Sequence, residues 1–400
     1  MKIDKKESYN EAYPRNYNGP IRTNLDKAHS PFKVLDHPQL IRKYTCGEKV
    51  APIHIRVGLT NRCNLRCNFC NFHSPNEKSF YNAFNYNDML GTEKVIKFLQ
   101  DFSENGGKAV TFCGSGECTI HPGYEEICYS AQKFGLKIGL ITNGTMLDKA
   151  EMLECVIKTH TWVRVGLNAG SSETYSQVVN YKESAFNSIL ESVKYLRSNA
   201  EEKEFKVGLN FVITLQNCHE IVDAVKAAQK ANADYIRFEP EFYSSLAHET
   251  IYEKISDINQ QLETAKSMSS EEFEVSIPKL DRGPMANTDK IEGDFQKCHY
   301  CNFVTALGAD GYMYPCPQIH LNIKYRMGNA IENGYSSYIK SGEKEKWLSE
   351  NCDRTQNCKT CFYRPQNELL EWLSDGRLDV DDVLNQYNRD YPETLHKFFV

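Results

Sequence analysis

Short hydrophobic runs recur between about residues 53 and 280, separated by stretches in which hydrophobic residues have helical spacing. Strands that alternate with helices in this order favour parallel strands joined by right-handed crossovers. We therefore predict an α/β fold, a partial (β/α)6 barrel similar to a TIM barrel, with an open twisted sheet as the alternative. The predicted strands are 53–60, 109–116, 137–144, 162–168, 206–214 and 234–240, and the predicted helices include 92–104, 124–134, 183–198 and 219–231.

Polar residues alternate with apolar ones in the fourth and sixth of these strands. Successive side chains of a strand point to opposite faces, so the apolar residues are expected to pack against helices. Arg164, Gly166 and Asn168 would then face the lumen of the barrel, as would Arg237 and Glu239. Such inward residues contact a substrate or cofactor in one interpretation. In the other, Arg237 and Glu239 form only an internal ion pair.

The 400 residues are enough for one large domain and a smaller one. Residues 1–50 are polar and are expected to be an irregular lead-in, and residues 51–285 to form the barrel. The alternation stops near residue 285, and a cysteine-bearing region continues to 365. Residues 366–400 are predicted to be a helical tail that packs on the body of the protein.

The composition, 40% hydrophobic and 25% charged, is that of a globular protein. A net charge of −6 gives no reason to expect nucleic acid or an anionic membrane as a partner. There is no run of about 18 apolar residues that could span a bilayer. The first 16 residues lack the apolar core of an export signal. These features predict a cytoplasmic location.

Fifteen cysteines are unusual for a chain expected in a reducing compartment, where clustered cysteines more often bind metal or do chemistry. Three lie within residues 63–70 and six within residues 298–361. We expect most of the others to be small buried hydrophobic residues. These are Cys46, Cys113, Cys118, Cys128, Cys155 and Cys218.

The first group, Cys63, Cys67 and Cys70, forms a C-x3-C-x2-C array directly after the first predicted strand. Three thiolates this close can bind three irons of a cubane [4Fe–4S] cluster and leave the fourth iron open to another ligand. Zinc is the alternative, but a closed structural zinc site needs a fourth ligand, which His73 could supply.

This array, with the aromatic Phe69 before its last cysteine, resembles the signature of the radical S-adenosylmethionine (SAM) superfamily. The resemblance implies that the open iron binds the amino and carboxylate groups of SAM and that Phe69 lies against the adenine. Electron transfer from the cluster would cleave SAM and give a 5′-deoxyadenosyl radical that abstracts a substrate hydrogen. A flavodoxin or ferredoxin would be the electron donor.

Three further segments resemble SAM contacts of this superfamily. A glycine-rich turn after the second strand resembles the motif that binds the SAM amino group, although Ser115 and Cys118 stand where Gly and Pro are common. Asn143 lies at the end of the third strand, which resembles the same strand end in the superfamily. Asn168 stands where the superfamily often has a contact to the ribose. Gly166 replaces a frequent Ser, so that contact could be lost. The residues of the glycine-rich turn are Gly114, Ser115, Gly116 and Glu117.

The second group of cysteines resembles the C-terminal SPASM or twitch extension of radical SAM enzymes. The matching features are Asp310-Gly311, Pro315-Cys316, Gly328-Asn329 and a closing C-x2-C. The resemblance implies one auxiliary [4Fe–4S] cluster, hence two clusters in all. Cys301 and Cys352 would be spare, or one would replace a favoured ligand, and a zinc knuckle is the alternative. The favoured ligands are Cys298, Cys316, Cys358 and Cys361.

An auxiliary cluster can accept an electron, which suits a net two-electron oxidation. The single-cluster extension also resembles that of enzymes acting on sugars or aminocyclitols, which implies oxidation or epimerisation of an alcohol carbon in such a small-molecule substrate. Modification of a ribosomally made peptide is the alternative, but about 50 residues before the first strand are too few for a leader-binding domain. Glu239 could accept a proton and Arg237 could bind an acidic group. An epimerase would need a hydrogen donor such as Cys118 or Cys218. A non-catalytic iron–sulfur sensor or scaffold remains the second alternative.

Overall fold

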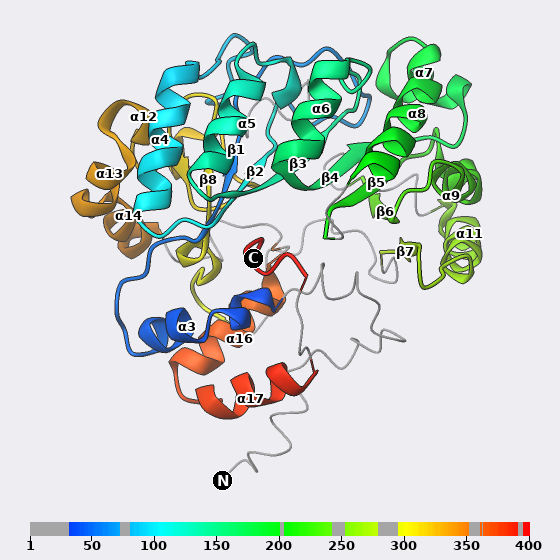
Figure 1. Ribbon diagram of the computed structural model, residues 1–400. Coiled ribbons are helices and arrows are strands. Elements are labelled where there is room, and N and C mark those ends of the chain that lie inside the picture. Colours follow the sequence, from blue (N-terminus) through cyan, green and yellow to red (C-terminus); the bar gives the residue numbers. More distant parts are fainter. Residues whose placement is uncertain are drawn as a thin grey trace.

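The computed structural model describes residues 32–72, 81–200, 204–241, 253–278, 295–351, 361, 363–390 and 395–400. Within them a single sheet has the strand order β7-β6-β5-β4-β3-β2-β1-β8-β9 (Figure 1). All neighbouring strands are parallel except β8 and β9. The strands are β1 (His54–Val57), β2 (Ala109–Phe112), β3 (Lys137–Thr142), β4 (His160–Gly166), β5 (Lys206–Ile213), β6 (Tyr235–Pro240), β7 (Glu274–Ser276), β8 (Val304–Leu307) and β9 (Met313–Tyr314).

This order confirms the predicted α/β fold, and all six predicted strands are present. The sheet is larger than predicted because the cysteine-bearing region contributes to it. β8 pairs with the free side of β1, so that Arg56 lies opposite Ala306. The region after residue 285 therefore extends the sheet of the barrel rather than forming a separate layer.

Helices cover the outer face of the sheet (Figure 1). In α8 the predicted stripe of Ala185, Ile189, Val193 and Leu196 is buried, as expected for a helix that packs along one side. The helices are α4 (Thr92–Glu104), α5 (Tyr124–Lys133), α6 (Ala150–Thr159), α7 (Ser172–Val179), α8 (Ser184–Asn199), α9 (Ile221–Lys230) and α11 (Ile255–Ser267).

The cysteine-bearing region has three short helices, of which the first two pack against α4 and the third packs against the second. They are α12 (Ala330–Asn333), α13 (Tyr335–Ser341) and α14 (Glu343–Asn351). Tyr335 is fully buried and meets the rings of Phe98 and Phe102 edge-on, at centroid distances of 5.5 and 5.2 Å. Asp101 accepts a hydrogen bond from the backbone N–H of Ser336 at 2.6 Å. These contacts join the region to the barrel.

A second hydrophobic core lies below the sheet in Figure 1 and joins both ends of the described chain. It contains α3 (Pro38–Thr45), α16 (Arg364–Ser374) and α17 (Val380–Asp390), together with the short 3-10 helix η5 (Tyr300–Asn302). The predicted helical tail is thus present. The lead-in, in contrast, is helical over 33–36 and 38–45 rather than irregular.

Residues 395–400 lie across the amino-terminal end of the strands. His54 donates from Nδ1 to the carbonyl of Val400 at 3.1 Å, and the Tyr300 hydroxyl donates to the same oxygen at 3.1 Å. The ring of Phe399 meets His54 and Trp162 edge-on, both at 5.5 Å. This segment fills the end of the barrel opposite to the predicted site.

Substitution of Phe399 by Ala should therefore destabilise the whole protein. Deleting a buried aromatic side chain costs about 3 kcal/mol or more, because a cavity remains between His54 and Trp162. The check is the urea midpoint of unfolding. Tyr195→Ala, at an exposed helical tyrosine, is the control and should change the midpoint little. Equal midpoints for both variants would contradict a sealing role of this segment.

Candidate active site

The loop after β1 brings the three cysteines of the first group together. Cys63, Cys67 and Cys70 are half-buried, and the backbone N–H of Cys70 donates to the carbonyl of Cys67 at 3.1 Å. Burial raises the pKa of the Cys63 thiol to about 11, and burial and the other two thiols raise the pKa of Cys67 further. The raised pKa values of Cys63 and Cys67 mean that these two thiols need a bound cation to become thiolates at neutral pH.

Ligands of a single ion converge on one point, whereas the thiolates of a cluster bind different irons. Across the described residues, no three His, Cys, Asp or Glu side chains converge as ligands of one ion would. In a cubane cluster each thiolate binds a different iron, so three ligands lie further apart. The three thiols are the set expected to hold a [4Fe–4S] cluster, and His73, the alternative fourth ligand of zinc, lies outside the described residues.

The glycine-rich turn after β2 supports the start of this loop. A Cβ on Gly116 would lie 2.3 Å from the carbonyl oxygen of Arg62 and 2.4 Å from that of Thr60. The Ser115 hydroxyl donates to the side-chain oxygen of Asn61, and the backbone N–H of Glu117 donates to Arg62 at 2.9 Å. Only glycine permits so close an approach of the two backbones.

Glu117 links the end of β2 to the end of β3. One carboxylate oxygen accepts hydrogen bonds from the Thr119 hydroxyl at 2.6 Å and the Thr142 hydroxyl at 2.8 Å. The other accepts from the backbone N–H of Asn143 at 2.7 Å. Because the side chain is only 4% exposed, these bonds hold the predicted SAM contacts in fixed positions.

Glu117→Gln should weaken this arrangement, because the amide nitrogen of Gln would face hydrogen-bond donors. We expect a loss of about 1–3 kcal/mol in stability and roughly tenfold weaker SAM binding, with the iron content retained. Thermal unfolding and anaerobic equilibrium binding of SAM measure the two effects. Glu126→Gln, on an exposed face of α5, should leave both unchanged. Unaltered SAM binding in Glu117→Gln would contradict the positioning role.

Asn143 reaches from β3 toward the cysteine loop. Its Nδ2 donates to the side-chain oxygen of Asn64 at 2.9 Å and lies 3.9 Å from the sulfur of Cys63. Thr145 donates to Asn143 Oδ1 from its backbone and from its hydroxyl. The sequence-predicted residue is thus brought beside the first cysteine.

For Phe69 and Asn168, the contacts in the structure are with the core and with a neighbouring strand rather than with the cysteines. Phe69 is half-buried and packs against the main core. Asn168 has a left-handed backbone with φ of 57°, and its Oδ1 accepts from the backbone N–H of Val212 at 2.9 Å. That bond joins the ends of β4 and β5, so a ribose contact would have to use the remaining Nδ2 of Asn168.

The second group of thiols gathers around η5. A hydrogen bond with Cys298 lowers the pKa of the Cys301 thiol. Cys316 lies close enough to oppose this with a smaller raising effect. The Asn367 side chain donates to Cys361 at 3.5 Å and accepts from the backbone N–H of His299 and Tyr300. The predicted ligand Cys358 lies outside the described residues, as does Cys352.

Cys301, expected to be spare or to replace a favoured ligand, lies beside the predicted ligands. It is fully buried beside the predicted ligand Cys298, and the buried Lys344 ammonium favours its thiolate. The C-x2-C spacing of Cys298 and Cys301 was the signal in the sequence that the two thiols lie together. Spacing to Cys316 favoured Cys298, and only the fold shows that Cys301 lies near Cys316.

Charged side chains line the lumen on the inner faces of β1, β4 and β6. Arg237 pairs with Glu239 at 2.6 Å, which confirms the internal ion pair. Arg164 donates from Nε to the Tyr235 hydroxyl at 3.2 Å. Burial lowers the pKa of Arg237, Glu239 opposes this, and the nearby charges of Arg164 and Arg56 add to it. The three guanidiniums thus lie close enough to repel one another.

Arg56 was not singled out in the sequence, although alternation in the first strand gives the signal. Ile55 and Val57 are fully buried on the helix side, so Arg56 points inward. Burial opposes its charge, but attraction to the ionised forms of Tyr363, Tyr300 and the neighbouring thiols outweighs burial and raises the pKa of Arg56. Cys113 and Cys316 are those thiols, so Arg56 lies between the lumen and the second group of cysteines.

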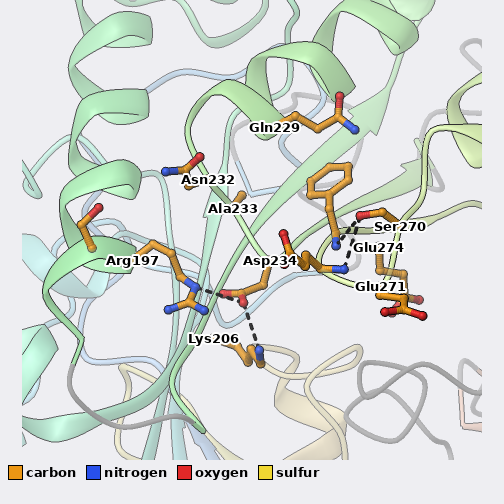
Figure 2. A pocket seen from close by; sticks show the side chains of 12 residues that line it. Arg197, Lys206, Gln229, Asn232, Ala233, Asp234, Ser270, Glu271 and Glu274 are labelled. Atoms are coloured by element: carbon orange, nitrogen blue, oxygen red, sulfur yellow. Dashed lines mark hydrogen bonds and ion pairs between the residues drawn. The ribbon is translucent and has the colours of Figure 1, made fainter.

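A surface pocket of about 800 Å³ lies at the other end of the sheet (Figure 2). Its polar centre is Asp234, which pairs with Lys206 at 3.0 Å and Arg197 at 3.2 Å. Lys206 begins β5 and Asp234 precedes β6, whereas the predicted chemistry lies after the carboxyl ends of the strands. The pocket is therefore not part of the candidate site.

Residues 57–228, which include the cysteine triplet and the glycine-rich turn, match the model of the radical SAM superfamily. The chain belongs to this superfamily. It is thus a radical SAM enzyme, and the superfamily implies a [4Fe–4S] cluster and SAM as cofactors. None of the helices in the described segments has the length and hydrophobicity needed to cross a bilayer.

Curated relatives of this radical SAM enzyme have different activities in their names. A GTP 3′,8-cyclase of Aquifex aeolicus is 28% identical over 308 residues, covering 73% of this chain and 84% of the relative. A second GTP 3′,8-cyclase, from Helicobacter pylori, is 25% identical over 66% of this chain and 79% of its own. An Fe-coproporphyrin III synthase of Methanosarcina barkeri is 29% identical, but over only 41% of this chain and 37% of that protein.

Solved structures share the fold at low identity. SuiB of Streptococcus suis bound to SAM has a TM-score of 0.57 and 13% identity, over 79% of this chain and 70% of SuiB. The structure of anSMEcpe with bound AdoMet has a TM-score of 0.53 and 14% identity, over 84% of this chain and all of the other. The radical SAM fold thus extends well beyond residues 57–228.

Proposed function

We propose that the chain is a radical SAM oxidoreductase that oxidises or epimerises an alcohol carbon of a sugar or aminocyclitol. The observation that carries this proposal is the proximity of Cys316 to Arg56 in the lumen, because it brings a second group of thiols to the substrate space. We propose one auxiliary [4Fe–4S] cluster there, held by Cys298, Cys316, Cys361 and Cys358, with Cys301 as the candidate to replace one of them.

The proposed division of the chain assigns residues 51–285 to the radical SAM core and 286–365 to the auxiliary region. In the core, Cys63, Cys67 and Cys70 would hold the first cluster. The proposed SAM contacts are Phe69, Gly114, Ser115, Gly116, Glu117, Asn143 and Asn168. With both cofactors bound, the site would supply a 5′-deoxyadenosyl radical that removes one hydrogen atom from the substrate.

Oxidation of an alcohol carbon to a carbonyl removes two electrons and two protons. The radical takes one hydrogen atom, so one proton and one electron remain to be transferred. Glu239 is the proposed proton acceptor, because it is a half-buried carboxylate on the inner face of β6. The thiol-rich region beside Arg56 is the proposed place of the electron acceptor.

The side chain of Asn210 supports a hydroxyl-bearing substrate. It lies on the inner face of β5, opposite Arg237, and its Oδ1 is buried with no hydrogen-bond partner among the described residues. A buried acceptor without a donor is costly, and a substrate hydroxyl would satisfy it. The hydroxyl would then lie near Glu239.

Glu239→Gln should abolish proton acceptance, because the amide has nearly the same size and shape as the carboxylate but is not a base. We expect product formation to fall at least about a hundredfold, in line with the loss of a general base, while uncoupled SAM cleavage continues. Product and 5′-deoxyadenosine are measured by mass spectrometry in the same anaerobic samples. Glu271→Gln, at an exposed residue, is the control. Unchanged product formation would exclude Glu239 as the base.

Two other substrate classes deserve the same screen. SuiB has been solved with its precursor peptide and shares the fold at a TM-score of 0.54, which keeps a peptide as an alternative. Several relatives are named GTP 3′,8-cyclase, so a nucleotide is a further alternative substrate. An electron donor such as flavodoxin or ferredoxin is part of the proposal in each case.

The test is anaerobic. The protein is reconstituted with iron and sulfide, reduced and mixed with SAM, and 5′-deoxyadenosine is measured. Deuterated polyols, peptides and GTP are then compared for deuterium transfer into that product. Transfer from a polyol carbinol position supports the proposal, and transfer only from a peptide or GTP overturns the substrate class. Iron without SAM cleavage would favour the sensor or scaffold alternative.

A further inference from the structure

The lumen carries more positive than negative charge in the described part of the chain. Arg56, Arg164 and Arg237 come from three different strands, and Glu239 is the carboxylate that acts on Arg164 and Arg237. Three guanidiniums and one carboxylate leave a formal charge of +2. The three arginines are half-buried, so water screens their repulsion only in part, and an anion bound among them would relieve it.

Arg56 is the group whose hydrogen bonds are incomplete. Its Nε is buried and has no partner among the described residues. The groups around it are the thiols of Cys113 and Cys316 and the hydroxyls of Tyr300 and Tyr363, which are neutral when protonated. A guanidinium in such surroundings is a donor that lacks an anionic acceptor.

Arg164 lies in a space built for it. Its guanidinium is 5.7 Å from the ring centroid of Trp162 and 5.8 Å from that of Tyr235. A Cβ on Gly139 would lie 2.4 Å from the Trp162 ring, and one on Gly208 would lie 2.0 Å from the Tyr235 ring. Two glycines thus make room for the aromatic rings that flank this cation in the lumen.

The rings of Tyr300 and Tyr363 form a further wall next to Arg56. They stack at a centroid distance of 3.8 Å and an interplanar angle of 12°. Rigid aromatic walls fix the direction of the neighbouring guanidinium and lower the local dielectric constant. Both effects strengthen the attraction of an anion that enters.

From this juxtaposition we propose that the substrate carries an anionic group, a phosphate or a carboxylate, that Arg56 and Arg164 bind in the lumen, with Arg237 beside them. Guanidinium groups match the planar, bidentate geometry of both anions. Arg237 keeps its pair with Glu239, so one carboxylate stays available near the reacting carbon. The inference rests on the proposed function, and it narrows the alcohol substrate to an acidic or phosphorylated one.

Binding of the anion is tested apart from SAM cleavage. The oxidised holoenzyme is saturated with SAM, which fills the carboxylate site on the cluster, and is titrated calorimetrically with inorganic phosphate and with malonate. We expect at least one of them to bind, and Arg56→Gln and Arg164→Gln each to weaken binding about tenfold or more. The probe that binds with the higher affinity shows whether the site prefers a phosphate or a carboxylate group.

The control is Arg377→Gln, since Arg377 is an exposed arginine that pairs with Asp375 far from the lumen. It should bind the probes as the native protein does. If a Gln variant fails to fold, Arg56→Lys or Arg164→Lys keeps the positive charge but loses the bidentate guanidinium geometry, and should also weaken binding. Circular dichroism and iron content identify misfolded samples.

A matched series of substrates gives the second readout. A neutral hexose, its 6-phosphate, its uronic acid and its 2-amino derivative are compared for stimulation of 5′-deoxyadenosine formation. Stimulation by an anionic member only is the expected result. Native protein that binds neither phosphate nor malonate, or that responds best to the amino sugar, overturns the inference even if SAM is cleaved. Absence of SAM cleavage with intact anion binding would instead refute the proposed function.

Discussion

Cys67→Ala should give a protein that folds but makes no 5′-deoxyadenosine. Cys67 packs against the main core and lies in the middle of the loop that brings the triplet together. Loss of one of three ligands leaves the first cluster with too few protein bonds. The iron content should fall from about eight to about four per chain, the share of the auxiliary cluster.

Iron analysis, the visible spectrum and mass spectrometry of 5′-deoxyadenosine measure this result under anaerobic conditions. Cys46→Ala is the matched control, because Cys46 is an exposed cysteine on the cap of α3. It should keep the native iron content and activity. SAM cleavage by Cys67→Ala at the native rate would refute the assignment of the catalytic cluster, whatever its iron content.

Gly116→Ala should have the next largest effect, through the backbone rather than through a ligand. The added methyl group would meet the carbonyl oxygens of Thr60 and Arg62, which cannot turn aside as a flexible side chain could. Thr60 is fixed in turn, since its hydroxyl donates to Asp88 at 3.1 Å. We expect a loss of about 1–3 kcal/mol in stability and a displaced approach to Cys63.

The urea midpoint and the iron content after reconstitution measure these two consequences. Gly91→Ala is the control, because a Cβ there meets nothing within 4 Å and its φ of −73° suits any residue. The control should match the native protein in both measurements. Full iron incorporation and native stability in Gly116→Ala would show that the two backbones can separate without harm to the loop.

The six strands of the barrel and the directions of their side chains could be predicted from the sequence. Val163, Val165 and Leu167 are fully buried, as the alternation required. Five of the six predicted strands end too late, as β2 stops at Phe112, because the chain stays extended or turns beyond the last paired residue. Local patterns predict which face a residue occupies, whereas strand ends depend on the neighbouring strand.

Contacts between distant segments could not be predicted. Nothing in the four residues of β8 shows that they pair with β1 rather than form a separate hairpin, because pairing depends on the whole sheet. For the same reason the sequence could group Cys298 and Cys316 by family resemblance but could not place Arg56 beside Cys316. The second core similarly depends on α3 and α16 meeting across more than 300 residues.

The pairing of β1 with β8 has a consequence for the synthesis of the protein. β1 ends at residue 57 and β8 begins at residue 304, so a ribosome must add nearly 250 residues before β1 has both neighbours. At ordinary elongation rates of about 5–20 residues per second this takes roughly 12–50 s. During that interval the cysteine loop emerges on an incomplete sheet, where its thiols are open to oxidation. Growth with little oxygen before harvest should therefore protect the nascent chain as well as the finished enzyme.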